Sequence, residues 1–359
     1  MRVKVLMLGW EYPPMINGGL GVACEGLVGA MRTAAEVRLL LPGEVEGGES
    51  GGGIQRIGAY GSGDGLYGDG LRERVLGFAE AVVEDVEGSE FDLIHAHDWM
   101  TLVAGMAVKA RTGKPLVAHV HSLEFDRSGP GERGWVFEIE KEGMNQADVV
   151  VAVSAYTAEI CEQMYGIDRG KVAVVHNGVT GGGERSPGRE ALVVFVGRLA
   201  RQKGPEMFGR IATVVRERFP GVRFVVAGDG ELRESLAGAP VEMAGFLGRR
   251  EIRELLSRAK VFCMPSLSEP FGIAALEAAL SGVAVVVSKQ SGVREVLGSA
   301  RLVDAGDEAG WIEQVCKLLG DEEERRRVAE AVRAEAERCS WEAAAAKMLG
   351  VYRGWLGLG

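Results

Sequence analysis

The sequence has no long hydrophobic run, no paired cysteine motif and no excess of positive charge. No apolar stretch reaches the length that spans a membrane, and a strand-like run starts within the first residues, so we expect neither a transmembrane helix nor a signal peptide. The five cysteines are scattered without a C-x-x-C pair, which favours free thiols in a reducing cytoplasm. The net charge of −10 argues against a broad surface for nucleic acid or anionic membranes. We therefore expect a cytoplasmic protein without a nucleic-acid partner.

The sequence also lacks the usual pattern for a divalent metal that binds a nucleotide diphosphate. No D-x-D pair lies beside an apolar strand. Two H-x-H pairs occur, His95 with His97 and His119 with His121, and such a pair can bind metal. However, only His176 follows them, so the second half of the chain offers no further imidazole ligand. We predict no metal site, and the pairs remain either packing and hydrogen-bonding groups or neutral polar contacts to a ligand.

Short β-branched runs alternate with amphipathic helical stretches through most of the chain. The expected strands are residues 3–8, 36–41, 91–96, 115–120, 148–153, 171–176, 192–197, 222–228, 241–246, 260–265, 283–288 and 300–305. Continuous apolar strands separated by helices are typical of parallel sheets that helices cover on both faces. Residues 178–190 are rich in Gly, Ser, Pro and charge, as an interdomain linker is. We predict two doubly wound, Rossmann-like α/β domains, 1–180 and 190–339, that face a cleft, with ligands at the carboxyl ends of strands.

A glycine-rich loop follows the first expected strand. Gly18, Gly19 and Gly21 lie just before or at the start of a helix, where exposed amides suit an anion and a ligand can approach the backbone. A dinucleotide-binding fingerprint is the competing interpretation. The loop from Trp10 to Asn17 is too long for the tight turn of that fingerprint, which argues against it. A turn that only caps the helix remains open.

A second glycine-rich region spans residues 43–70. We predict a surface loop there, after the second strand. It is either disordered filler or, because it contains Tyr60 and Tyr67, a flap that contacts a sugar.

Two cations follow the first expected strand of the second half, in the segment VFVGRLARQKG. Arg198 leaves the strand end, and Lys203 comes five residues later, before a helix. A guanidinium that bonds in a fork and a compact ammonium suit a diphosphate. A solvated basic turn is the alternative.

The segment PSLSEPFGIAALEAALSG predicts a second anion site. We expect a helix to begin near Pro270, because proline suits the first helical turn. The free amides near Phe271, Gly272 and Ile273 would then face a ligand.

Two glutamates belong to the same segment. Glu269 precedes the expected helix and Glu277 lies eight residues later, within it. The helical rise alone separates them by about 10 Å, too far for a close carboxylate pair such as the acid and base of a hydrolase. Two separate acceptor roles fit better, such as one for a sugar and one for a ribose. For Glu269, a charge that only complements the helix dipole is the alternative.

Together these motifs resemble the two-Rossmann GT-B glycosyltransferases, in particular the glycogen and starch synthases and the related group 1 retaining transferases. The matching segments occur in family order over about four-fifths of the chain and are WEYPPMINGGLG, HAHDWMT, HVHSLEFDRSG, EKEGMNQADVVVAVS, HNGV, VGRLARQKG, VAGDGEL and SEPFGIAALEA. The resemblance implies retaining transfer of a hexose, glucose first among them, from an ADP- or UDP-hexose to a carbohydrate acceptor. It implies no further cofactor, and a last helix, residues 340–359, that crosses back to the first domain.

The resemblance also implies a role for each candidate residue. The expected catalytic residues are Arg198 and Lys203 on the diphosphate leaving group, Glu269 on sugar hydroxyls, and His121 on the transferred sugar near its 6-hydroxyl. The expected donor-binding residues are Gly18, Gly19, Phe271, Gly272, Ile273 and, on the ribose, Glu277. Asp98 falls in the acceptor-side segment.

One departure leaves the acceptor open. Met15-Ile16-Asn17 stands where many bacterial glycogen synthases carry a lysine before the two glycines. A group 1 transferase with a non-glucan acceptor is therefore an alternative. A GT-B sugar-nucleotide epimerase and a non-catalytic nucleotide-sugar-binding protein are the others.

Overall fold

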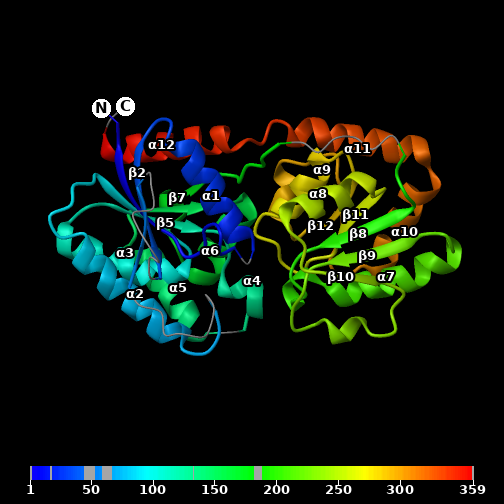
Figure 1. Cartoon of the computed structure of the whole chain (residues 1–359), viewed down its shortest axis with the longest axis horizontal. Helices are drawn as coiled ribbons and strands as arrows, with labels where there is room; N and C mark the ends of the chain where they lie inside the picture. Colours follow the sequence, from blue (N-terminus) through cyan, green and yellow to red (C-terminus); the bar gives the residue numbers. More distant parts are fainter. Residues whose placement is uncertain are drawn as a thin grey trace. The chain divides into compact units, whose positions relative to one another are not determined.

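The computed structural model describes residues 2–16, 18–43, 53–58, 67–131, 133–181 and 188–357. The chain forms two compact units. The first unit comprises Met1–Phe125, Gly129–Gly178 and Trp341–Gly359, and the second comprises Asp126–Ser128 and Val179–Ser340. Each unit contains a parallel β-sheet with α-helices packed on it, which confirms the predicted α/β class (Figure 1).

Over its described residues, the first unit has a seven-stranded sheet in the order β3-β2-β1-β4-β5-β6-β7, with every neighbouring pair parallel. The strands are β1 (Lys4–Leu8), β2 (Glu36–Pro42), β3 (Ile54–Ile57), β4 (Leu93–His97), β5 (Leu116–Val120), β6 (Val149–Ala152) and β7 (Val172–Val174). The central strands β1, β4 and β5 are buried almost throughout, because helices cover both faces of their continuous apolar runs. The helices up to residue 178 are α1 (Gly19–Met31), α2 (Leu71–Asp85), α3 (Trp99–Thr112), α4 (Glu124–Ser128), α5 (Trp135–Gln146), α6 (Ala155–Tyr165) and the 3-10 helix η1 (Arg169–Lys171).

The sheet of the second unit has six strands, in the order β10-β9-β8-β11-β12-β13, and is also parallel over its described residues. The strands are β8 (Leu192–Val196), β9 (Arg223–Ala227), β10 (Glu242–Gly245), β11 (Val261–Met264), β12 (Ala284–Ser288) and β13 (Arg301–Val303). The helices are η2 (Arg201–Lys203), α7 (Pro205–Arg218), η3 (Glu234–Leu236), α8 (Arg249–Arg258), α9 (Ile273–Leu280), η4 (Gly292–Glu295), α10 (Glu308–Gly320) and α11 (Glu322–Ala336).

Both sheets reverse their direction of growth at a defined pair of strands. In the first unit the reversal lies between β1 and β4, and in the second it lies between β8 and β11. Ligands of doubly wound sheets bind outside the carboxyl ends of the strands at this switch point. The residues that follow β1, β4, β8 and β11 are therefore the ones to examine for a functional site.

The prediction of a surface loop at residues 43–70 is wrong for part of this range. Ile54–Ile57 forms β3, which pairs with β2 in parallel. This strand is short and only half-buried, so it lacks the continuous apolar run that marks the other strands. Residues 44–52 and 59–66, including Tyr60, lie outside the described residues, as do residues 182–187 of the predicted linker.

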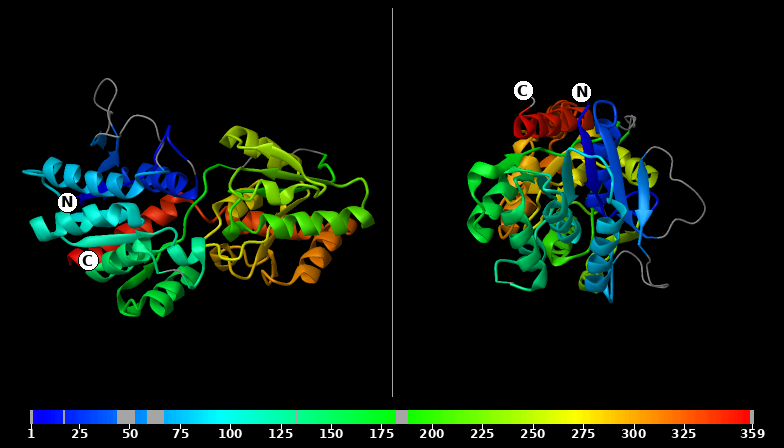
Figure 2. Two further views of the ribbon diagram at one scale, coloured as in Figure 1. Left: turned by 90° about the horizontal axis from the view of Figure 1, so that it is seen from below. Right: turned by 90° about the vertical axis from the view of Figure 1, so that its left-hand side faces the viewer.

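The last helix, α12 (Trp341–Leu356), packs against α1 in the first unit (Figures 1 and 2). Gly26 makes this close approach feasible: a Cβ atom there would lie 2.2 Å from the indole ring of Trp341. The C-terminal helix therefore completes the first unit, as the resemblance to GT-B proteins implies.

We predict that Gly26→Ala lowers the free energy of unfolding of the first unit by about 1–3 kcal/mol, since overpacking at a tight contact forces neighbouring groups to shift. Gly29→Ala is the matched control, because Gly29 is exposed on the same helix and a Cβ there meets nothing within 4 Å. The control should gain stability, by up to about 1 kcal/mol, from the higher helix propensity of alanine. Urea unfolding of both variants measures the difference, and equal effects would contradict the packing argument.

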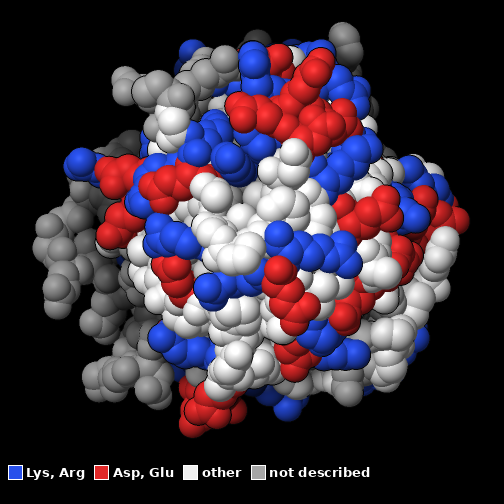
Figure 3. All heavy atoms as spheres, turned by 90° about the vertical axis from the view of Figure 1, so that its right-hand side faces the viewer, with Lys and Arg blue, Asp and Glu red and all other residues white. Residues whose placement is uncertain are grey.

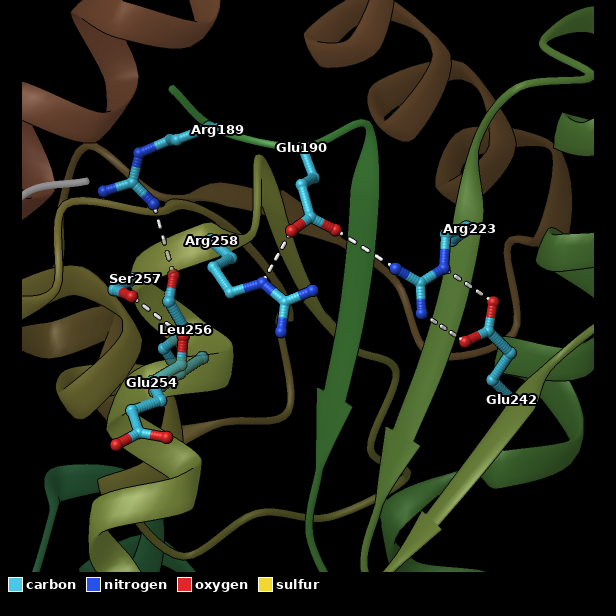
Figure 4. Close-up of polar contacts among 8 residues, drawn as sticks. All are labelled: Arg189, Glu190, Arg223, Glu242, Glu254, Leu256, Ser257 and Arg258. Atoms are coloured by element: carbon cyan, nitrogen blue, oxygen red, sulfur yellow. Dashed lines mark hydrogen bonds and ion pairs between the residues drawn. The ribbon is translucent and has the colours of Figure 1, made fainter. Parts of the chain in front are cut away.

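The amino ends of β8, β9 and β10 carry a chain of ion pairs (Figure 4). Glu190 binds Arg258 at 2.6 Å and Arg223 at 3.1 Å, and Arg223 binds Glu242 at 2.5 Å. The hydrogen bond to Arg258 lowers the pKa of Glu190, and the hydrogen bond to Arg223 lowers that of Glu242. These side chains are largely exposed, so the pairs add little stability, and they lie at the edge of the sheet opposite to the ligand edge.

Charges of both signs are mixed on the molecular surface that Figure 3 shows, with Lys and Arg side chains beside Asp and Glu. Mixed charge of this kind does not form the single-sign patch that binds a nucleic-acid backbone. Among the described residues, no helix is both long and apolar enough to cross a membrane.

Candidate functional site

In the second unit, the loops after β8 and β11 meet at the switch point. The amide of Leu267, after β11, donates to the carbonyl oxygen of Gln202, after β8, at 2.8 Å. Gly204 has a φ of 69°, and a Cβ atom there would lie 2.1 Å from the carbonyl oxygen of Pro265, so the two loops can approach this closely only with glycine at this position. The loops that carry Arg198, Lys203 and Glu269 are thus held together by backbone contacts.

Lys203 and Glu269 form a charge pair at this position. The Lys203 Nζ atom lies 2.5 Å from Glu269 Oε2, and the hydroxyl of Ser266 donates to the same oxygen at 3.4 Å. The exposed fractions of the two side chains are 23% for Lys203 and 6% for Glu269. The sequence placed both residues at strand ends, and the structure shows that they contact each other.

The backbone around Glu269 is fixed by the segment after β12. The amide of Glu269 donates to the carbonyl oxygen of Gln290 at 2.8 Å, and its carbonyl oxygen accepts from the amide of Gly292 at 2.9 Å. The carbonyl oxygen of Phe271 accepts from the amide of Val293 at 2.6 Å. These bonds place the Glu269 carboxylate on an extended, anchored backbone.

The predicted helix start near Pro270 is wrong. Helix α9 begins at Ile273, after Gly272 with a φ of 105°. The backbone on either side of Pro270 is bound to the segment after β12, so the chain turns into the helix only at Gly272, which adopts the left-handed conformation readily. Phe271 is buried, and only Ile273 of the predicted set belongs to the first helical turn.

Arg198 lies five residues before Lys203 in the sequence, but its side chain is highly exposed. Its side chain has an exposed fraction of 70% and makes an ion pair of 3.6 Å with Glu231, which is also exposed. Such a surface pair is weak, so the guanidinium can exchange Glu231 for a bound anion at low cost. Gly197 and Gly228 allow β8 and β9 to end close together, because a Cβ atom on Gly228 would lie 1.9 Å from the carbonyl oxygen of Gly197.

Glu277 lies within α9, away from the Lys203–Glu269 pair in the chain. Burial raises the pKa of the Glu277 carboxyl group, and the charges of Arg249 and Arg253 on α8 oppose this shift. A buried carboxyl group of this kind is better suited to a hydrogen bond with a hydroxyl group than to an ion pair in solvent.

In the first unit, the amides at the start of α1 already have an anionic partner. The amides of Gly18 and Gly21 donate to Oε2 of Glu11, both at 3.2 Å, and the hydroxyl of Tyr67 donates to Oε1. The predicted anion site at Gly18 and Gly19 thus contains a carboxylate of the chain itself. Sequence reasoning missed Glu11, although an acid three residues after β1 and before a glycine-rich helix start was a usable signal.

The two H-x-H pairs form one buried cluster at the carboxyl ends of β4 and β5, with His121 directly after β5. His97 lies opposite His119 in the parallel register. His95 Nε2 lies 3.1 Å from His119 Nδ1, and His97 Nδ1 lies 2.9 Å from His121 Nε2. His95 Nδ1 is also hydrogen-bonded to the hydroxyl of Tyr352 on α12. The neighbouring strand therefore brings further imidazoles to each H-x-H pair, and nitrogen atoms of His95, His97 and His119 lie within 4.8 Å of one another.

These histidines are neutral at physiological pH. Burial is the main cause, and it lowers the pKa of His95 and of His121 to about 3. Burial likewise holds the pKa of His97 and of His119 well below the usual value. Three buried ring nitrogens in this described cluster have no hydrogen-bond partner, namely His97 Nε2, His119 Nε2 and His121 Nδ1.

Asp98 lies directly after β4 and is also buried. Its Oδ1 atom accepts from the amide of His121 at 2.6 Å and from the amide of Ser122 at 3.2 Å. The carboxylate thus ties the end of β4 to the end of β5. The structure brings Asp98 and His121 together, as neighbouring parallel strands predict, and it places both at the switch-point edge of the first sheet.

Comparisons with known proteins match this architecture. The family model for glycosyl transferases group 1 matches residues 182–335, and that for glycosyltransferase family 4 matches residues 17–180. An uncharacterized glycosyltransferase of Methanocaldococcus jannaschii is 30% identical, with 82% of this chain and 83% of that protein covered. The alpha-maltose-1-phosphate synthase of Mycolicibacterium smegmatis is also 30% identical, with 98% and 99% covered.

A solved structure has the same fold. The catalytic domain of starch synthase IV from Arabidopsis thaliana, bound to ADP and acarbose, superposes with a TM-score of 0.79 at 17% identity. The match covers 99% of this chain and 100% of that chain. This likeness confirms the predicted GT-B type of fold.

Proposed function

The chain belongs to the group 1 glycosyltransferases, and we propose that it transfers a hexose from a nucleoside-diphosphate sugar to a carbohydrate hydroxyl with retention of configuration. Glucose is the first candidate for the hexose, with ADP or UDP as the nucleotide. The observation that carries the proposal is the Lys203–Glu269 pair at the switch point of the second sheet. It sets a cation and a carboxylate side by side where a doubly wound sheet binds its ligand.

Arg198 and Lys203 are the proposed partners of the diphosphate. The bond between the anomeric carbon and the phosphate oxygen breaks, and negative charge develops on the departing diphosphate. Two cations stabilise that charge, the exposed guanidinium in a fork and the Lys203 ammonium as a compact charge. The acceptor hydroxyl forms the new bond on the same face of the sugar and passes its proton to the leaving phosphate.

Glu269 is proposed to bind hydroxyl groups of the transferred sugar. Its carboxylate is already oriented by Lys203 and Ser266, and its backbone is anchored after β12. Such a group suits precise recognition of hydroxyls, and no step requires it to form a covalent bond to the sugar. Glu277 is the proposed ribose contact, and the backbone at Phe271, Gly272 and Ile273 is the proposed contact of the donor phosphates.

In the first unit, His121 is proposed to contact the transferred sugar, Asp98 to serve the acceptor side, and Gly18 and Gly19 to face the donor. For Gly18 the bond to Glu11 adds a condition, because a diphosphate would have to share or displace that carboxylate. The ADP- and acarbose-bound starch synthase and the maltose-1-phosphate synthase support a nucleotide donor and a glucose-type substrate. A non-glucan acceptor is the second candidate, favoured by Met15 and Ile16 in place of a lysine.

A mixed-acceptor turnover assay with product analysis tests the proposal. A retaining transferase yields a glycoside with the anomeric configuration of the donor, which proton couplings at the anomeric carbon report. An epimerase would convert the donor without needing an acceptor, and a non-catalytic binding protein would give no product. An inverted product would overturn the retaining mechanism while leaving the transfer itself.

We predict that transfer does not need a divalent cation, because two protein cations are available to the diphosphate. Turnover after exhaustive chelation should equal that of untreated protein. Loss of activity that only Mg²⁺ or Mn²⁺ restores would contradict this prediction.

A further inference from the structure

The ring and the backbone of His121 are held from several sides. Its Nε2 atom lies 2.9 Å from His97 Nδ1, and its amide donates to Asp98 Oδ1 at 2.6 Å. Its ring packs at 4.1 Å, between centroids, on the ring of His119. A side chain that contacts a substrate is most effective when neighbours fix its rotamer in this way. The contacts around His121 therefore suit a side chain that binds a substrate.

The backbone that carries His97 and Asp98 is itself constrained. Asp98 has a φ of 59° and a ψ of 173°, a region that residues other than glycine rarely adopt. The amide of Asp98 donates to the carbonyl oxygen of His119, and Thr101 binds the carbonyl oxygens of both His97 and Asp98. A strained residue persists only where its surroundings fix it, so the end of β4 is a rigid support for His121.

Neutral imidazoles in a pair have linked donor and acceptor roles. Each neutral ring carries one N–H group and one bare nitrogen. If His97 donates to His121, then His121 Nδ1 carries the hydrogen; if His121 donates, its Nδ1 is bare. The state of His97 therefore determines whether the unpartnered Nδ1 of His121 acts as a donor or as an acceptor.

We propose that His97 is a positioning residue, which sets the ring orientation and tautomer of His121, the proposed contact of the transferred sugar. This inference rests on the proposed transferase function.

His95 provides a matched comparison within the same cluster. It lies two residues before His97 on β4, is equally buried, and stacks on His97 with 4.3 Å between ring centroids. Its ring nitrogens bind His119 and Tyr352 instead of His121. A substitution at His95 thus disturbs the same core without removing the contact to His121.

The test uses two substitutions of similar polarity at one position. Asn places its amide group close to the Nδ1 position of histidine, whereas Gln places it close to Nε2. We expect His97→Asn to retain the contact to His121 and His97→Gln to lose it. In His97→Gln, kcat should fall by about 10-fold to 100-fold, as for the loss of a group that orients a functional ligand. His97→Asn should recover most of that loss, and His95→Gln should transfer at near the parent rate.

Nitrogen-15 NMR of the His121 ring supplies a readout that does not depend on activity. The shifts of Nδ1 and Nε2 report the tautomer, and they should change in His97→Gln but not in His95→Gln. Unchanged shifts and unchanged kcat in His97→Gln would overturn the positioning role. If the parent protein transfers no sugar from any donor, the proposed function fails. In that case a changed His121 tautomer in His97→Gln would still support the positioning of His121 by His97.

Discussion

Glu269→Gln is expected to leave nucleoside diphosphate binding nearly unchanged and to lower hexose transfer by about 100-fold or more, as for the loss of a transition-state contact. The substitution keeps the shape of the side chain and removes its charge. In the structure this carboxylate is almost fully buried and accepts hydrogen bonds from Lys203 and Ser266. Because the shape of the side chain is kept, the substitution removes the charged, oriented acceptor and not the fold. Initial rates and isothermal titration with the diphosphate measure the two effects separately.

Lys203→Ala should have a different signature, because its ammonium is the proposed partner of the leaving group. Diphosphate binding and transfer should both weaken. Glu190→Gln is the matched control for Glu269→Gln: it is the same change of charge in the same unit, at the amino ends of the strands. The control should transfer at the parent rate. If Glu269→Gln does so as well, the assignment of Glu269 to the sugar site is wrong.

The histidine cluster should make the first unit sensitive to mild acid. The folded protein holds the four imidazoles of His95, His97, His119 and His121 neutral, whereas unfolded histidines have a pKa of about 6.5. Below that pH the unfolded state binds more protons than the folded state, so stability is full above pH 6.5 and falls as the pH decreases toward the folded pKa of about 3 that His95 and His121 show. Each histidine that stays neutral in the folded state contributes a slope of at most about 1.4 kcal/mol per pH unit, which is reached once its unfolded form is fully protonated, and four such histidines contribute at most about 5.4 kcal/mol per pH unit.

Hydrogen exchange of the β4 and β5 amides, corrected for intrinsic rates, measures this slope between pH 6.5 and pH 5, before most carboxylates titrate. His95→Gln should reduce the slope, by at most about 1.4 kcal/mol per pH unit near pH 5, because one buried imidazole is lost. A flat profile across this window, or an unchanged slope in the variant, would show that protons enter the cluster without unfolding it.

The general fold followed from the sequence because of one simple pattern. Continuous apolar runs alternating with helices predicted two parallel sheets, and the structure has them. The pattern failed at β3, whose half-buried residues lie in a glycine-rich region, and at the start of α9, where tertiary hydrogen bonds after β12 delay the helix beyond Pro270. Both misses arise because contacts with distant segments overrode a local preference.

For the candidate site, residue types and strand ends could be predicted, but partners could not. Lys203 and Glu269 were each placed after a strand, yet their contact depends on the adjacency of β8 and β11. The bond between His95 and Tyr352 joins residues 257 positions apart, and no local pattern announces it. Glu11 was missed for the same reason, since its role depends on how the loop after β1 folds back onto α1.

The decisive measurement is the release of nucleoside diphosphate from a panel of nucleotide-activated hexoses, with and without a glucan acceptor. The parent protein should release diphosphate from at least one hexose donor, a carbohydrate acceptor should accelerate the release, and Glu269→Gln should abolish the acceleration. Absence of release from every donor with every carbohydrate acceptor, in protein that binds the diphosphate, would contradict the proposed function.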